Sequence, residues 1–557
     1  MLGLRFAGGP VILAGAVMIS GARAPTPGPA AACAPGTSVT LKIAATADVH
    51  GHLQGWDYYA DRADSDRGLT RAATIVDSLR AADRGRVVLV DAGDILQGTP
   101  LAYVAARVVR AGPNPIIAAM NAMRYDAAAV GNHEFNYGVP YLDSAVSQAR
   151  FPFLAANATS GRHARFPRFT LIRRAGATVG IVGATTPGSD LWDAAHLSAA
   201  RLHINDIVPA VGWAVAEARA AGADVVVVVL HSGLDEPSSY DTVATGVASE
   251  NVSSRVAREV AGIDVIVYGH SHRENPGTVI GQTLLIQPKN WATSVAIATI
   301  PLSCSAAGRW KTGIASGTVV KAAGHAEDAT VLRAVDAAHR ETLAYVNSVV
   351  GTTQDEFRAD SGRVRPTALA GFILSVERRA AGAQLASTAI FDTAARLGPG
   401  RITVAQLARL YPYDNTLRAI RISGAQLRAY LEHSSRYYRT ESSGALVPDS
   451  SVAGYNFDVV SGVDYRIDVT QPVGRRITSL KWQGKEVSPI DTFTLALNNY
   501  RQTGGGGYSM LRGAPVVYDH QQEIRQLLTD EVRRLGRIRA TDYDNHNWSL
   551  ADPSRTP

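Results

Sequence analysis

The sequence has 557 residues, which is too many for one hydrophobic core, and we expect about two to four domains. Hydrophobic residues make up 46% of the chain and charged residues 19%, a balance typical of folded globular proteins. The net charge of +6 is modest, and the Lys and Arg residues form no basic run. This argues against a stable nucleic-acid complex but permits a small anionic substrate.

The amino-terminal segment 1–24 has the features of a cleaved signal peptide. Arg5 precedes an apolar stretch from about residue 8 to residue 20, and small residues follow at 22–24. The apolar stretch is shorter than the ~20 residues of a membrane-spanning helix, so we expect no transmembrane anchor. Residues 25–38 are rich in Pro, Ala and Gly and predict a disordered leader. We therefore expect a periplasmic or secreted protein.

The chain contains only two cysteines, Cys33 and Cys304. Two cysteines exclude a disulfide framework, but they leave open a single bridge between them. Cys33 follows two alanines and also has a faint likeness to a lipid-attachment site. Neither cysteine is a credible nucleophile in this sequence.

Apolar runs bounded by turn residues predict strands at 40–45, 86–90, 126–130, 179–184, 224–230 and 263–268, and a helix at 68–82. Side chains that could bind a metal follow five of these strands. They are Asp48 and His50, Asp94, Asn132, His231, and His270 and His272. Ligands of open α/β sheets bind at the carboxyl ends of the strands, so this regular placement predicts one site. Asp91 is more typical of a loop-capping residue.

These seven side chains offer oxygen and nitrogen donors, too many for one tetrahedral ion but enough for two if one carboxylate bridges them. The donor types admit Zn, Mn, Fe or Co and do not decide among them. His133 is not needed as a ligand and can protonate a leaving oxygen or stabilise a charged transition state. The set indicates metal-assisted hydrolysis of a phosphoester.

The same residues, in order, resemble the signature of the calcineurin-like metallophosphoesterases: Asp48-x-His50, Gly93-Asp94, Gly131-Asn132-His133-Glu134, His231 and Gly269-His270-x-His272. The resemblance implies an α/β fold with a four-layer α/β/β/α sandwich over residues 39–323. It further implies two ion sites that share Asp94. One would add Asp48, His50 and His272, and the other Asn132, His231 and His270. His133 would be the catalytic residue.

A helix-compatible segment, 324–350, predicts a connector to a second domain at 351–550. That second half resembles the α+β carboxyl-terminal domain of the 5'-nucleotidase superfamily, which binds the nucleoside. The resemblance implies that Tyr413 and Tyr500 hold the base between their rings, where stacking suits any base. It also places Arg363 and Arg396 as substrate-binding residues, with guanidinium groups suited to phosphate.

Two positions depart from the 5'-nucleotidase pattern. Asn136 stands where that branch has an Asp that supports the catalytic His133, and Gly506 stands where it has an Asp for the ribose hydroxyls. Both fit the branch of 2',3'-cyclic-nucleotide 2'-phosphodiesterases/3'-nucleotidases, because a carboxylate at position 506 would repel a phosphate on the ribose. Further segments resemble the same branch: 57–59, 96–101, 131–138, 455–458 and 467–472. We assign Asn136 to the catalytic set together with His133. Because Asn136 is neutral, His133 loses a charged partner, and we expect its role as an acid to depend more on the metals.

Two alternatives stay open. The chain could be a 5'-nucleotidase or nucleotide-sugar hydrolase, which turnover of AMP far above 3'-AMP would establish. It could also be a non-catalytic exported nucleotide-binding protein, although lost catalysis would remove the need for the complete ligand set. The sequence has no repeats or heptads, so we expect no structural role, and we expect a monomer.

Overall fold

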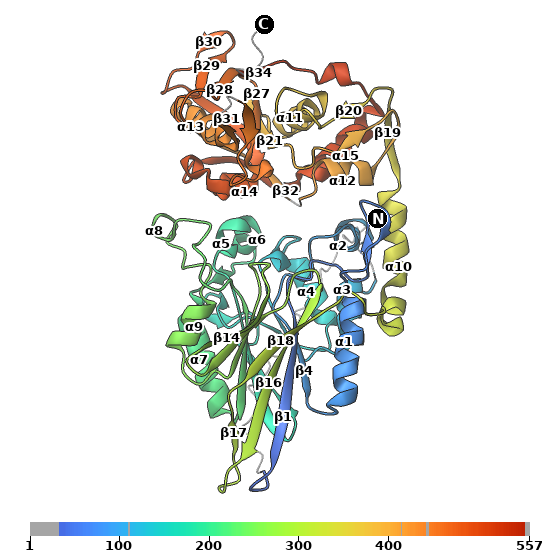
Figure 1. Cartoon of the computed structure of the whole chain (residues 1–557), viewed down its shortest axis with the longest axis vertical. Coiled ribbons are helices and arrows are strands. Elements are labelled where there is room, and N and C mark those ends of the chain that lie inside the picture. The colour runs from blue at the N-terminus through green and yellow to red at the C-terminus, as the bar shows by residue number, and fades with distance from the viewer. Residues whose placement is uncertain (1–32, 110–111, 414, 442–444, 552–557) are drawn as a thin grey trace, which may run out of the picture.

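The structure is a computed structural model that describes residues 33–109, 112–413, 415–441 and 445–551. Figure 1 shows an amino-terminal domain in the lower half and a carboxyl-terminal domain above it. The predicted signal peptide 1–24 and residues 25–32 of the predicted leader lie outside the described residues.

Cys33 and Cys304 form a disulfide, the single bridge that the sequence left open. Cys304 is the last residue of β16 (Ser294–Cys304). The backbone N–H groups of Cys33 and Gly36 also donate to the carbonyl oxygens of Gly308 and Cys304. Residues 33–37 are therefore attached to the sheet, which differs from the disordered leader expected there. The bridge uses the Cys33 thiol that lipid attachment would need.

Two β-sheets face each other in the amino-terminal domain. The first has the strand order β17-β16-β1-β4-β5-β6, with β18 also paired to β16, and the second has the order β14-β15-β13-β12-β10-β9. The remaining strands of the first sheet are β1 (Ser38–Thr46), β4 (Val87–Asp91), β5 (Ala127–Ala129), β6 (Phe153–Leu154), β17 (Trp310–Thr312) and β18 (Ser316–Lys321). Those of the second are β9 (Phe169–Arg174), β10 (Ala177–Thr185), β12 (Val225–His231), β13 (Val265–Tyr268), β14 (Asn275–Ile280) and β15 (Thr283–Gln287).

Strand β12 shows why the central strands are apolar along their whole length. Val225, Val227 and Val229 face the core between the two sheets. The alternate residues 226, 228 and 230 face the helices on the outer side. Because both faces are buried, the strand lacks the polar alternation of a half-exposed strand.

Helices cover the outer face of each sheet. The first sheet is covered by α1 (Leu69–Ala82), α3 (Pro115–Met123), α4 (Val139–Gln148) and α10 (Ala329–Val346). The second is covered by α7 (Ile207–Ala220) and α9 (Ser253–Glu259). These layers confirm the predicted four-layer α/β/β/α sandwich.

Helix α10 occupies the predicted connector segment. It begins after Asp328, whose carboxylate caps the N–H groups of Thr330 and Val331. Val331 and Val335 bury their side chains in the same core as α1 and α3, so the helix is packed onto the amino-terminal domain. The chain then enters the second domain at β19 (Val349–Thr353). The boundaries 39–323, 324–350 and 351–550 stay predictions.

A five-stranded sheet of order β27-β21-β31-β24-β32 forms the centre of the carboxyl-terminal domain. Its strands are β21 (Leu385–Ala389), β24 (Thr416–Ser423), β27 (Asp458–Ser461), β31 (Thr492–Asn498) and β32 (Val516–Glu523). The helices α11 (Ala368–Ala381), α13 (Gly424–Ser434) and α15 (Ile524–Leu535) share its hydrophobic core. Two smaller sheets contain β19, β23 (Gly400–Thr403) and β33 (Arg537–Ile538), and β28 (Asp464–Asp468), β29 (Ile477–Trp482), β30 (Lys485–Glu486) and β34 (Trp548–Ala551). The mixed α and β content of this domain was also predicted.

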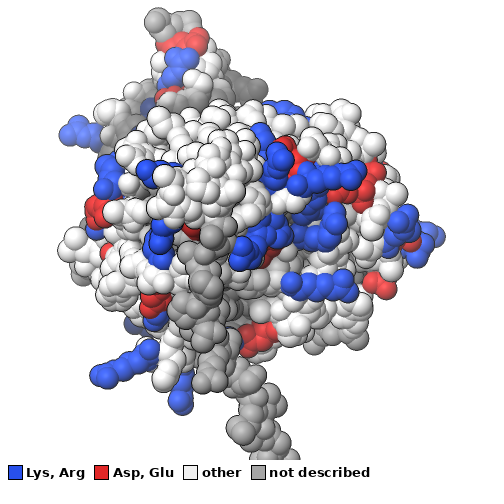
Figure 2. Space-filling view, turned by 90° about the horizontal axis from the view of Figure 1, so that it is seen from below, with Lys and Arg blue, Asp and Glu red and all other residues white. Residues whose placement is uncertain are grey.

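Within the described residues, the structure has no helix of the length and apolarity that a membrane crossing requires. Figure 2 shows the end of the amino-terminal domain that faces away from the carboxyl-terminal domain. On this face Lys and Arg side chains stand in separate groups, several with Asp or Glu beside them. Such a mixed surface agrees with the absence of a basic run in the sequence.

Candidate active site

The seven predicted ligands lie at the carboxyl ends of strands, as the sequence indicated: His231 is the last residue of β12, and the other six lie in loops after β1, β4, β5 and β13. Five of them have left-handed backbone conformations: Asp48 (φ 52°), His50 (φ 50°), Asp94 (φ 60°), His270 (φ 73°) and His272 (φ 54°). Non-glycine residues seldom adopt this region, and such strain persists where the surrounding structure holds it, often at functional sites. The loops are therefore shaped to present these side chains.

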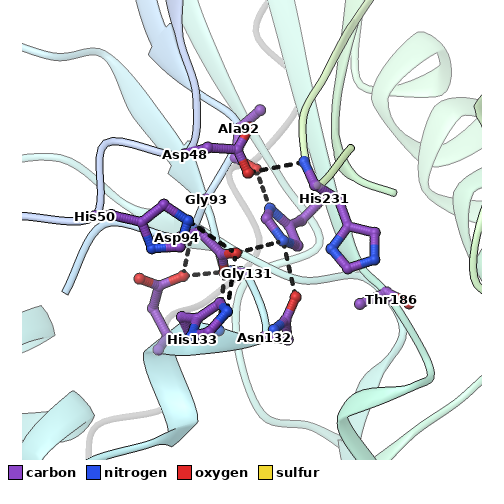
Figure 3. A network of polar contacts seen from close by, with 12 residues as sticks. Asp48, His50, Ala92, Gly93, Asp94, Gly131, Asn132, His133, Thr186 and His231 are labelled. Atoms are coloured by element: carbon purple, nitrogen blue, oxygen red, sulfur yellow. Dashed lines mark hydrogen bonds and ion pairs between the residues drawn. The ribbon is translucent and has the colours of Figure 1, made fainter. Parts of the chain in front are cut away.

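Asp94 lies at the centre of the cluster (Figure 3). Its Oδ2 atom is 3.1 Å from Nε2 of His231 and 3.8 Å from Nε2 of His50. Its Oδ1 atom accepts a hydrogen bond from the backbone N–H of His133 at 2.8 Å. Oδ1 of Asn132 lies 3.0 Å from Nε2 of His231. Asp94 therefore faces ligands of both predicted ion sites.

Backbone carbonyl oxygens orient two of the imidazole rings. Nδ1 of His50 is 2.9 Å from the carbonyl oxygen of Gln97, and Nδ1 of His231 is 2.8 Å from that of Ala92. A ring nitrogen that donates to a carbonyl leaves the other nitrogen to face an ion. In both histidines that other nitrogen, Nε2, points toward Asp94.

Asp48 closes the opposite side of the cluster. Its Oδ1 accepts from the backbone N–H of His270 at 2.9 Å and lies 3.7 Å from Nε2 of His272. Its Oδ2 is buried and has no hydrogen-bond partner among the described residues. Three groups in this part of the chain have donor atoms close enough to share an ion: Asp48, His50 and His272; His50, Asp94 and His133; and Asp94, His231 and His270.

The pKa values of His50 and His231 are shifted in opposite directions. Burial, reinforced by the nearby His133, lowers the pKa of His50 to about 3, so this ring is neutral and has a free lone pair. Burial also disfavours a charged His231, but Asp94 outweighs it and raises the pKa of His231 to about 10. Burial acts against the charge of Asp94 as well, yet His231 and His133 hold the pKa of Asp94 well below its usual range. A divalent ion would displace the proton of His231.

The buried carboxylate of Glu134 holds the backbone of the Asp94 loop. Its carboxylate accepts hydrogen bonds from the backbone N–H groups of Asp94, Ile95, Leu96 and Gly131 at 2.6–3.0 Å. A Cβ atom at Gly131 would lie 2.3 Å from Oδ1 of Asp94, so only glycine permits this approach. The sequence motif contained Glu134, but its contacts were not predicted.

Glu250 is a site residue that the sequence did not reveal. Its Oε1 accepts from Nε2 of His270 at 2.7 Å, and the ring of Trp192 stacks on the same imidazole at 5.7 Å. A carboxylate behind an imidazole fixes the ring and strengthens it as a ligand. Glu250 lies in an irregular segment between α8 (Thr242–Thr245) and α9, where no sequence pattern marks it.

His133 has a hydrogen-bonded partner in Asn136, as its place in the sequence suggested. Nδ1 of His133 lies 2.6 Å from Oδ1 of Asn136, and Nδ2 of Asn136 donates to Oδ1 of Asp193 at 2.9 Å. Asp193 follows α5 (Ser189–Trp192), after the Thr-Thr-Pro-Gly loop of β10. That loop follows a predicted strand, and this signal could have pointed to Asp193.

A cavity of about 1060 Å³ lies between the two domains. The amino-terminal domain contributes His50, Asn132, His133, His270 and His272 to its wall, among others. Tyr413 and Tyr500 line the opposite wall and are half-exposed, at 46% and 45%. Tyr413 precedes β24 and Tyr500 follows β31, and the antiparallel pairing of Leu417 with Asn498 brings these two strand ends together.

The structure does not bring Arg363 and Arg396 to this cavity. Arg363 donates to the carbonyl oxygen of Ile390, and Arg396 forms an ion pair with Glu356 at 3.3 Å. Neither lines the cavity in the described part of the chain, and their substrate-binding role stays a prediction. The guanidinium groups on the cavity wall are those of Arg67, Arg107 and Arg418.

Arg501 explains why position 506 is glycine. Its guanidinium forms a two-point ion pair with Asp458, at 2.9 Å and 2.8 Å, and Nη1 donates to the carbonyl oxygen of Gly505 at 2.9 Å. A Cβ atom at Gly506 (φ 72°) would lie 2.3 Å from Nη1 of Arg501 and 2.3 Å from Oδ1 of Asn456. Arg501 and Asn456 therefore leave no room for an acidic side chain at this position.

Comparison with known proteins agrees with this architecture. Residues 41–274 match the family model of calcineurin-like phosphoesterases, and residues 349–513 match that of the 5'-nucleotidase carboxyl-terminal domain. Over 92% of its length the chain is 30% identical to the 2',3'-cyclic-nucleotide 2'-phosphodiesterase/3'-nucleotidase of Salmonella typhimurium, of which it covers 89%. The protein belongs to the 5'-nucleotidase family of metallophosphoesterases. It is therefore a phosphoric ester hydrolase, and the calcineurin-like family uses divalent metal ions.

Two further proteins similar to this phosphoesterase are named for nucleotide hydrolysis. It is 29% identical, over 98% of its length, to the trifunctional nucleotide phosphoesterase protein YfkN of Bacillus subtilis, but it spans only 41% of that longer protein. A solved structure from Staphylococcus aureus, assigned as a 5'-nucleotidase and determined with alpha-ketoglutarate, superposes with a TM-score of 0.75 at 25% identity. That match covers 92% of this chain and 100% of the other.

Proposed function

We propose that this phosphoesterase is an exported enzyme with two divalent ions. It hydrolyses 2',3'-cyclic nucleotides to 3'-nucleotides and then 3'-nucleotides to nucleoside and phosphate. The observation that carries the proposal is that four of the predicted ligands, His50, Asn132, His270 and His272, line one cavity together with His133, Tyr413 and Tyr500. A nucleotide in this cavity can place its phosphate at the cluster and its base against the two rings.

The donor set fits divalent ions on physical grounds. Nε2 of His50 and Nε2 of His272 lie 3.0 Å apart, and a neutral His50 offers only a lone pair toward its neighbour. Asp48 adds a buried carboxylate oxygen without a partner among the described residues. A cation would be attracted to this carboxylate oxygen and to the lone pair of His50. Zn, Mn, Fe or Co suit such mixed donors. When bound, two ions would supply an activated water and neutralise the phosphoryl oxygens.

His133 would deliver the proton that the leaving oxygen needs. In the first step water adds to phosphorus and the bond to the 2' oxygen breaks, so that this oxygen must gain a proton. In the second step water displaces the 3' oxygen, which again leaves as a hydroxyl. Asn136 holds Nδ1 of His133, so Nε2 is the nitrogen that can face the substrate. Tyr413 and Tyr500 would orient the nucleoside.

The region around Gly506 supports a substrate phosphorylated on the ribose. Arg501 and Asn456 occupy the space that an acidic side chain at position 506 would need. The glycine at this position therefore adds no carboxylate that would repel a 2' or 3' phosphate.

Export is supported by the Cys33–Cys304 disulfide. Structural disulfides persist in oxidising compartments such as the periplasm, and the predicted signal peptide agrees with that location.

The test is hydrolysis by the purified mature protein with Mn or Zn restored. Chromatography should show 2',3'-cyclic AMP converted first to 3'-AMP and then to adenosine, with 5'-AMP hydrolysed slowly. An Asp94→Asn variant serves as the control for contaminating phosphatases. Dominant turnover of 5'-AMP would move the assignment to a 5'-nucleotidase. Bound metal with no hydrolysis of any phosphoester would indicate a nucleotide-binding protein.

A further inference from the structure

The wall of the cavity near His133 contains a buried carboxylate to which the reaction assigns no role. Asp193 is 2% exposed, and its Oδ1 accepts from Nδ2 of Asn136 at 2.9 Å. Asn136 in turn holds Nδ1 of His133 at 2.6 Å. The three side chains form one continuous series of hydrogen bonds along the cavity wall.

The orientation of the Asn136 amide follows from the charge of Asp193. Burial raises the pKa of Asp193 to about 6, so the group is mainly ionised at neutral pH. An ionised carboxylate can only accept hydrogen bonds, and the NH₂ group of Asn136 must therefore face it. The amide oxygen then faces His133 and accepts from Nδ1, which fixes the ring and directs Nε2 toward the cavity.

We propose that Asp193 is a positioning residue for His133, which fixes the Asn136 amide and supplies, through it, a negative charge to the imidazole. Asn136 thus acts as a neutral spacer between the histidine and its carboxylate. This inference rests on the proposed phosphoester hydrolysis. It gives a reason for the buried carboxylate of Asp193, whose Oδ2 atom has no hydrogen-bond partner in the described residues.

The series can be tested by moving the carboxylate along it. Asp193→Asn removes the charge and allows the amide at 136 to turn over. We expect kcat to fall about 10- to 100-fold with KM changed less than about threefold, because the substrate contacts remain.

Asn136→Asp creates two buried carboxylates in contact and should lower kcat further. The double variant Asn136→Asp/Asp193→Asn restores one charge, now directly on His133, and the amide introduced at position 193 can donate to it. It should recover kcat to within about tenfold of the wild type.

Asp190→Asn is the matched control. Asp190 lies in helix α5, directly before Asp193, and pairs with His203 and the backbone N–H of Ile204, away from the series. We expect its variant to keep the wild-type kcat. If Asp193→Asn keeps the wild-type kcat, or if the double variant is no better than Asn136→Asp alone, the inference is overturned. A wild-type protein that hydrolyses no phosphoester would instead overturn the proposed function, so the two failures differ.

Discussion

The guanidinium of Arg418, in the carboxyl-terminal domain, donates from Nη2 to the backbone carbonyl oxygen of Trp192, in the amino-terminal domain, at 3.2 Å. Arg418 lies on β24 and is 3% exposed. Within its own domain it bonds Gln502 at 2.6 Å and pairs with Asp519 at 3.0 Å. Trp192 stacks on His270 and precedes Asp193, so this contact joins the carboxyl-terminal domain to residues that support His270 and Asn136.

Replacement of Arg418 by Lys should weaken this junction. A single ammonium cannot make the three contacts of the planar guanidinium, so we expect kcat/KM to fall about tenfold. Phosphate release and chromatography measure it. Arg421→Lys is the control, because Arg421 is exposed on the same strand. Equal effects of the two variants would show that the contact with Trp192 has no role in turnover.

Asp94→Asn should abolish binding of both proposed ions, because Asp94 faces ligands of both groups. We expect the wild type to bind about two ions per chain and the variant to lose at least about a thousandfold in rate, since the charge stabilisation of several kcal/mol is lost. Metal analysis by mass spectrometry and phosphate release check this.

Asp91→Asn is the matched control for Asp94. Asp91 ends strand β4, directly before the Asp94 loop, but its carboxylate caps the backbone N–H of Gly93 at 2.8 Å and accepts from the hydroxyl of Thr46. An amide oxygen can keep the Gly93 contact, so the variant should bind metal normally. Full metal content in Asp94→Asn, or its loss in Asp91→Asn, would contradict the ligand assignment.

Tyr500→Ala should raise KM for 3'-AMP by about 5- to 150-fold, which corresponds to the ~1–3 kcal/mol of one stacked base. Tyr500→Phe retains the ring and should stay within about threefold of the wild type. Steady-state kinetics measure both. Glycerol 2-phosphate has no base, so its hydrolysis should be unaffected. If Tyr500→Ala impairs both substrates equally, Tyr500 does not act through the base.

Asp193→Asn should stabilise the fold at neutral pH even though it lowers activity. The pKa of Asp193 is raised from 3.8 to about 6 in the folded protein, so the folded state binds this proton more tightly than the unfolded state. The stability of the wild type therefore falls as the pH rises through this range. The advantage of the variant in unfolding free energy should grow by roughly 1–2 kcal/mol between about pH 5 and about pH 7.5.

Urea unfolding of both metal-free proteins, with a chelator present, measures this difference. The other titrating groups are common to wild type and variant, so the difference isolates Asp193. A difference that is constant with pH would show that Asp193 does not carry the raised pKa.

Gly506→Ala should destabilise the protein by more than Gly513→Ala. Both glycines have similar left-handed backbones, with φ of 72° and 74°. A Cβ at Gly513 meets open space, whereas one at Gly506 meets Arg501 and Asn456. We expect a cost of about 1 kcal/mol at 513 and roughly 2–4 kcal/mol at 506, measured by urea unfolding. Equal costs would show that Arg501 does not restrict position 506.

The sequence determined the layout of the ligand loops. Apolar runs such as 224–230 and 263–268 predicted strands, and the polar residues directly after them predicted a shared edge. Parallel pairing makes this inference dependable, because it places the carboxyl ends of neighbouring strands together. The fold class and the position of the seven donor residues at strand ends were therefore available from local pattern. The donors follow strands of two different sheets, and only the tertiary structure brings the two sets together. Asn132, His133 and Asn136 belong to one turn, so their proximity is also local.

Only the tertiary structure decided what surrounds those residues. Glu250, Asp193 and Arg418 come from segments without a motif, and their contacts depend on how distant elements pack. The same holds for Cys33 and Cys304, which are 271 positions apart, and for Arg363, whose guanidinium bonds Ile390 instead of lining the cavity. A strand pattern specifies which residues lie at an edge. Which buried partner fixes each of them depends on packing across the whole domain, and no local sequence pattern carries that information.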